Sequence, residues 1–179
     1  MRIQWCALGG MHIAIGITGC VVAVVAAFFL WASLHELSHY IAIKRYRSNA
    51  KGEFFLYPHR HEGRFLWARV SWEFEGVELS PTELAWVSFA PRWPDLVGVI
   101  GTTVLALALG WSWWALWLVI LLGGSFFDLL IGSLGVNAES DLQRASRGWG
   151  ISPWALRVPG LTLTLLLMTL TTYGLAAGV

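Results

Sequence analysis

The chain has 179 residues, of which 56% are hydrophobic and only 13% are charged. Soluble domains carry about a quarter charged residues, so this apolar excess predicts a protein that lipid covers. The net charge of +1, with basic residues scattered over loops, does not indicate a nucleic-acid partner, and the two cysteines, Cys6 and Cys20, have no metal-ligand spacing.

Four apolar stretches are long enough to span a membrane. They cover about residues 13–43, 96–110, 113–134 and 154–177. For the second stretch an earlier start near Val87 is the alternative, because Pro91 and Pro94 interrupt the pattern there. The sequence therefore predicts a single integral-membrane domain, residues 1–179, that is mainly α: a polytopic membrane helix bundle of about four spans.

A small membrane-surface β element is predicted over residues 52–78, between the first two spans. Residues 65–74 contain aromatic and β-branched side chains with partial alternation, and residues 54–57 form a second short candidate strand. Residues 2–8 are a candidate edge strand for the same small sheet.

The basic residues predict the orientation of the chain. All Lys and Arg except Arg2 fall in the loop after the first span or in the loop before the fourth. By the positive-inside rule both loops face the cytoplasm, and four spans then place both termini outside. The sequence thus predicts a multi-pass protein of the cell membrane.

The end of the first span carries the pentapeptide His35-Glu36-Leu37-Ser38-His39. Two histidines four residues apart lie on one helix face, one turn apart, so both can reach one metal ion. Glu36 is placed to touch a water on that metal, which is the HExxH arrangement of zinc-dependent hydrolases. The alternative is a pair of structural histidines beside a paired glutamate. Lipid disfavours that alternative, since ionisable residues within a span are mostly functional.

The predicted orientation also gives the depth of this motif. Lys44 marks the cytoplasmic interface, and the two histidines precede it by five and nine residues. At about 1.5 Å per residue they lie roughly 7–14 Å inside that interface, within reach of water from the cytosol. The other histidines are expected not to be ligands: His12 at the outer end of the first span, and His59 and His61 in the basic loop.

A catalytic zinc site normally has three protein ligands and an open position for water, so the two histidines need a third partner. Asp128 lies in an apolar stretch at a depth similar to that of the motif, and its alternative role is that of a capping or inter-helix hydrogen-bonding carboxylate. Asp141 follows a polar turn, and its alternative role is that of a helix N-cap, for which Ser140 is equally suited. Both aspartates remain candidates at this point.

The sequence HELSHYIAIKRY resembles the HELGH-type helix of the site-2 protease family of intramembrane zinc metalloproteases. Residues 89–96 (FAPRWPDL) resemble the small-residue-plus-proline entry to that family's next core helix. In the family, an Asn-x-x-Pro turn then leads to Leu-Asp-Gly, whose aspartate is the third zinc ligand. Here FFDLLIG and ESDLQRA stand in that order, although the turn has no proline and Leu142 replaces the glycine.

By this resemblance, which covers roughly residues 28–145, Asp141 takes the place of the third zinc ligand. Asp128 takes the place of the asparagine that positions substrate, and it is also the alternate ligand. The family uses a membrane-embedded β-hairpin and an edge strand to hold substrate extended, which suits the predicted β element.

The resemblance implies an intramembrane zinc metalloendopeptidase that cleaves membrane-spanning proteins near the cytoplasmic face of the bilayer. Zn²⁺ would be bound by His35, His39 and Asp141, with Glu36 as general base. Two alternatives stay open: another zinc-dependent membrane hydrolase that acts on a prenyl-protein or lipid-linked substrate, or a non-catalytic metal-binding membrane protein. Two imidazoles and a carboxylate would also accept cobalt or iron.

Overall fold

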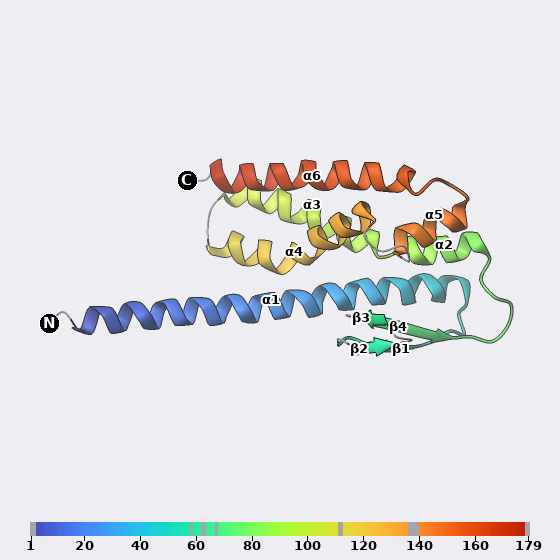
Figure 1. The fold of residues 1–179 in the computed structure, drawn as a ribbon, viewed down its shortest axis with the longest axis horizontal. Helices are drawn as coiled ribbons and strands as arrows, with labels where there is room; N and C mark the ends of the chain where they lie inside the picture. Colours follow the sequence, from blue (N-terminus) through green and yellow to red (C-terminus); the bar gives the residue numbers. More distant parts are fainter. Residues whose placement is uncertain are drawn as a thin grey trace.

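The computed structural model describes residues 3–57, 59–61, 64–66, 68–110, 113–135 and 140–177, with side chains described over 18–57, 60, 68–110, 122–135 and 140–177. This part of the chain is mainly helical, as predicted (Figure 1). Its elements are α1 Ile3–Tyr46, β1 Lys51–Phe55, β2 His59–His61, β3 Arg64–Leu66, β4 Arg69–Glu73, α2 Pro81–Phe89, α3 Arg92–Leu109, α4 Trp113–Leu134, α5 Asp141–Trp149 and α6 Trp154–Ala177.

Helix α1 runs along the whole molecule, and its N-terminal part projects beyond the other helices (Figure 1). It contains no proline, so nothing in its sequence interrupts the backbone hydrogen bonds. The expected edge strand at residues 2–8 is wrong over its described part, because residues from Ile3 onward belong to this helix. A helix pairs its own backbone groups, whereas a lone apolar strand in lipid would leave them unpaired.

Three helical segments among the described residues are long and apolar enough to cross a membrane: Thr18–Tyr46, Pro81–Leu109 and Trp154–Ala177. These segments are consistent with a membrane protein. The second one starts earlier than predicted, since α2 and α3 follow each other through a turn at Ala90 and Pro91. Helix α4 has the predicted bounds, but only its apolar part from Leu122 to Leu134 has described side chains. The span at residues 113–134 therefore stays a prediction.

Helices α3, α4 and α6 pack against one another, and α1 lies along α4 (Figure 1). The contact between α3 and α6 is made by small and hydroxyl-bearing residues. A side chain at Gly174 would meet the backbone of Ala106, and the Thr103 and Thr171 hydroxyls are hydrogen-bonded at 2.9 Å. Large apolar residues such as Val104 and Leu166 face outward instead. This arrangement is typical of helices that pack in lipid, where small residues let backbones approach closely.

The predicted β element is confirmed as a small sheet, with different bounds. Strands β1 and β4 form one antiparallel two-stranded sheet, with Phe54 opposite Val70. Strands β2 and β3, which lie between them in the sequence, form a second antiparallel pair. No strand follows Glu73 up to residue 78, so the sheet ends earlier than predicted. The β1–β4 sheet lies beside the C-terminal half of α1 (Figure 1), where Val70 is buried and Tyr40 packs on Phe54.

Candidate metal centre

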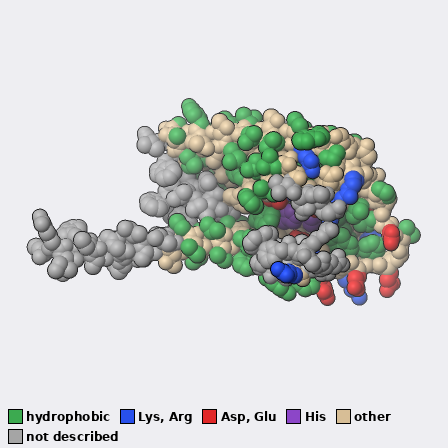
Figure 2. Space-filling model, viewed as in Figure 1, with side chains coloured by type: hydrophobic (Ala, Val, Ile, Leu, Met, Phe, Trp, Pro, Cys, Tyr) green, Lys and Arg blue, Asp and Glu red, His purple; other side chains and the backbone are tan. Residues whose placement is uncertain are grey.

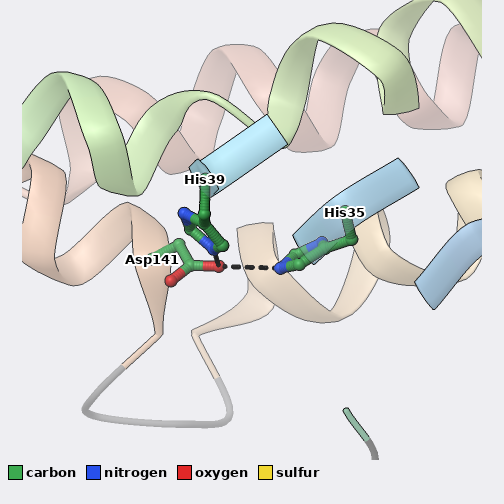
Figure 3. A group of neighbouring side chains, drawn as sticks. All are labelled: His35, His39 and Asp141. Atoms are coloured by element: carbon green, nitrogen blue, oxygen red, sulfur yellow. Dashed lines mark ion pairs between the residues drawn. The ribbon is translucent and has the colours of Figure 1, made fainter. Parts of the chain in front are cut away.

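The two motif histidines lie one turn apart on the same face of α1, with ring centroids 5.1 Å apart. Asp141 reaches them from the first turn of α5, far away in the sequence. Its Oδ2 atom lies 3.2 Å from His35 Nε2 and 3.5 Å from His39 Nε2 (Figure 3). The structure therefore brings together the three residues that the sequence predicts as ligands.

The two distances from Asp141 Oδ2 suit zinc. In a tetrahedral site with metal–ligand distances of 2.0–2.1 Å, neighbouring ligand atoms are about 3.3 Å apart. The two distances from Asp141 Oδ2 lie close to that value. Two imidazole nitrogens and one carboxylate oxygen are also a donor set that zinc accepts, and they leave the fourth position to water. The residues present thus fit a catalytic zinc ion.

Of the ring nitrogens that face away from Asp141, that of His39 has a hydrogen-bond acceptor and that of His35 faces a carboxylate. His39 Nδ1 lies 2.8 Å from the backbone carbonyl oxygen of Val87 on α2, and His35 Nδ1 lies 3.5 Å from Asp128 Oδ2. In a zinc-bound site each ring would keep its proton on Nδ1 and direct the lone pair of its Nε2 atom at the ion. Metal-binding histidines are typically oriented by an acceptor at the other nitrogen in this way.

Helix α5 begins so as to present Asp141 to the histidines. Ser140 has the extended backbone of an N-cap residue, so the N-cap position belongs to Ser140 and not to Asp141. Burial acts to raise the pKa of the Asp141 carboxyl, but the charges and hydrogen bonds of His39 and His35 outweigh it and lower that pKa well below its usual value. The carboxyl is therefore ionised at neutral pH, as a metal ligand must be.

Glu36 is 8% exposed and accepts a hydrogen bond from the sheet. The Val70 N–H of β4 donates to Glu36 Oε2 at 2.7 Å. Because Val70 N–H points toward α1, it takes no part in the β1–β4 ladder. The contact fixes one carboxylate oxygen of Glu36.

A second group of charged side chains lies behind His35, and sequence reasoning missed two of its members. Arg92 Nη1 lies 2.5 Å from Asp128 Oδ2 and 3.1 Å from Asp95 Oδ2, and Arg92 Nη2 lies 3.8 Å from Asp141 Oδ2. The charge pattern of the sequence places Arg92 in a basic loop, but in the structure it is buried in the first turn of α3. The available signal was an Arg-x-x-Asp pair at the start of an apolar span, since charges in such a position are mostly paired and functional.

The metal centre is partly open to its surroundings. The side chains of His35, His39 and Asp141 are 12%, 11% and 18% exposed. Histidine side chains are visible at the surface in Figure 2, among hydrophobic side chains. The side chains of His12, His59 and His61 lie outside the described residues, so their predicted lack of a ligand role remains a prediction.

No protein-family model, curated protein or solved structure matches this chain. The resemblance to the site-2 protease family therefore stands on the sequence motifs, and the assignment of function stands on the geometry of the site.

Proposed function

We propose that this chain is an intramembrane zinc metalloendopeptidase of the site-2 protease type. The observation that carries the proposal is the convergence of His35, His39 and Asp141, whose ligand atoms lie within 4.8 Å of one another, with Asp141 Oδ2 near the ligand spacing of a tetrahedral zinc site from both Nε2 atoms. Glu36 lies next to His35 on the same helix, in the position of the general base of an HExxH hydrolase. The three apolar helical segments support a location within the bilayer.

The chemistry divides between the ion and the side chains. A bound zinc ion would activate a water molecule and polarise the carbonyl group of the scissile bond. Glu36 accepts the proton of that water at Oε1, because Oε2 is held by Val70 N–H. It then gives the proton to the leaving amine. His35, His39 and Asp141 would be the ligands, with the His39 ring oriented by the Val87 carbonyl oxygen at its Nδ1 atom and the His35 ring facing Asp128.

The proposed substrate is a membrane-spanning protein whose helix unwinds near the site. A helix offers no accessible carbonyl while its backbone hydrogen bonds are made, so cleavage requires an extended segment. A free edge of the β1–β4 sheet would compensate the backbone groups that unwinding exposes. The sheet lies against the part of α1 that carries the motif, since Val70 contacts Glu36.

We place the site toward the cytoplasmic side of the cell membrane. Lys44 and Arg45 stand in the last turn of α1, a short distance beyond the histidines. The burial of Arg92 removes one residue from the count of loop cations, but the remaining Lys and Arg keep the same distribution. The positive-inside rule then puts the end of α1 at the cytoplasmic interface.

The test combines metal analysis with cleavage assays on the purified full-length protein in lipid. We expect one zinc per chain and cleavage of a single-span protein, with loss of about 10²–10⁴-fold in rate for Glu36→Gln and unchanged zinc content. Wild-type protein without bound metal would refute the proposal. Preferential cleavage of a prenylated peptide would indicate the other type of membrane hydrolase. Zinc binding without any Glu36-dependent cleavage would indicate a non-catalytic metal-binding protein.

A further inference from the structure

The side chains behind His35 lead to an inference that rests on the proposed function and deepens it. Asp128 on α4 faces the Nδ1 atom of His35, whereas Asp141 faces the Nε2 atom of the same ring. The two nitrogens of an imidazole point in different directions, so one metal ion bound at Nε2 lies away from a carboxylate at Nδ1. Asp128 is therefore placed to orient the His35 ring from the side opposite the ion, and not to bind the same ion as a ligand.

Arg92 explains why Asp128 holds this position. The residue Arg92 is only 4% exposed, and its Nη1 atom contacts both Asp128 and Asp95. Arginine stays protonated even when buried, and its planar group fixes the carboxylates that it contacts. Each of the three residues comes from α3 or α4, so the contact also ties these helices together behind the metal centre.

The same cluster could be mistaken for a second metal site. His35, Asp95 and Asp128 offer ligand atoms that lie within 4.8 Å of one another. However, Arg92 Nη1 contacts Oδ2 of both aspartates, at 2.5 Å and 3.1 Å. The guanidinium group thus already occupies the place of a cation between the two carboxylates.

We propose that Asp128 and Arg92 are positioning residues for the metal centre. Asp128 Oδ2 lies 3.5 Å from His35 Nδ1, and with zinc bound it would accept the Nδ1–H of that ring and keep Nε2 directed at the ion, while Arg92 keeps Asp128 in place. His39 has no such dependence, because its Nδ1 is bonded to the backbone carbonyl of Val87. The two histidines of one motif are therefore held by different means, one by a side chain and the other by the backbone.

The first experiment measures zinc affinity of the full-length protein by competition with a chelator. Asp128→Asn should lower the affinity by about 10–100-fold while one zinc per chain still binds, which is the usual effect of losing an outer partner of a ligand. In the cobalt-loaded protein the visible spectrum should keep its tetrahedral bands with shifted positions. Glu83→Gln is the control, because it makes the same carboxylate-to-amide change in the capping box of α2 and should leave affinity and spectrum unchanged.

The second experiment tests whether Arg92 acts through Asp128. Arg92→Gln alone leaves buried carboxylates without their cation and is the variant at risk of misfolding. The double variant Arg92→Gln with Asp128→Asn removes both charges of this contact, so that zinc affinity can still be measured. If Arg92 acts through Asp128, the double variant binds zinc as tightly as Asp128→Asn alone. A further loss of tenfold or more in the double variant would show an independent role and overturn this part of the proposal.

The outcomes separate this inference from the proposed function. If the wild type binds no metal, the proposed function fails first. If the wild type binds zinc and Asp128→Asn binds it equally well, only the positioning role is wrong. If Asp128→Asn loses the metal while Asp141→Asn keeps it, Asp128 is the ligand and the assignment made from the two ring nitrogens is overturned.

Discussion

Polar groups are buried in different ways in two regions of the molecule. One region is the contact between α3 and α6, and the other is the candidate metal centre. Between α3 and α6, the described polar contacts come from threonine hydroxyls: Thr103 bonds to Thr171 and to the Leu167 carbonyl, and close approach at Gly174 supplies the packing. At the metal centre, helices α1, α3, α4 and α5 bring charged residues together instead. Hydroxyl pairs are sufficient to pack helices in lipid, whereas a cluster of aspartates around an arginine and two histidines is costly unless it has a function.

The two regions should therefore respond to substitution in different measurements. Changes at the metal centre should alter metal binding and cleavage, whereas changes between α3 and α6 should alter stability alone. The predictions below test this separation.

The largest effect is expected for Asp141→Asn. The amide has no charge and is a poor zinc ligand, so zinc content should fall to background and cleavage should stop. Elemental analysis of the purified variant measures the metal directly. Because Ser140 and not Asp141 stands at the N-cap of α5, the helix should persist in the circular dichroism spectrum. A variant that keeps full zinc would show that Asp141 is not a ligand.

The next effect is expected for Gly174→Ala, at the contact between α3 and α6. A Cβ atom there would lie 2.8 Å from the backbone of Ala106, so the helices must separate, at a cost of about 1–3 kcal/mol in unfolding free energy. Gly101→Ala in α3 is the matched control, because a Cβ atom there meets nothing within 4 Å. Thermal denaturation in detergent compares the two variants. Zinc affinity should be unchanged in both, and a loss of zinc in Gly174→Ala would break the separation between the regions.

An effect of similar size, but on cleavage only, is expected for Val70→Pro. Proline removes the N–H that Glu36 Oε2 accepts, and it spares the β1–β4 ladder because that N–H points away from β1. Loss of a hydrogen bond to a charged group is worth about 1.5–3 kcal/mol, so the rate should fall at least about tenfold. Val70→Ala keeps the N–H and should retain most activity. Equal rates for the proline variant and the alanine control would mean that this contact does not position Glu36.

The smallest effect is expected for Thr171→Val. Its hydroxyl bonds to Thr103 and to the Leu167 carbonyl, and hydrogen bonds between helices in membranes average about 0.6 kcal/mol. Unfolding free energy should fall by about that amount, with no change in zinc content or cleavage rate. A double variant with Thr103→Val would measure the coupling between the two hydroxyls.

The helical class and the shared face of His35 and His39 on α1 could be predicted from the sequence because both depend on short-range geometry. Apolar length predicts helices in lipid, and a spacing of four residues puts His35 and His39 on one face whatever the rest of the chain does. The small sheet followed from strand composition, although its bounds did not. The proposed strand at residues 2–8 failed because composition does not distinguish a short apolar strand from the start of a long apolar helix.

The partners of the histidines depended on the tertiary structure. Sequence order alone could not tell which ring nitrogen of His35 faces Asp128 and which faces Asp141, because that depends on how α4 and α5 dock on α1. Nor could it place Arg92 between the aspartates, because residues near a span end look the same in a loop and in a buried first turn. Local spacing sets which residues share a face of one helix, and contacts between helices set what those residues meet.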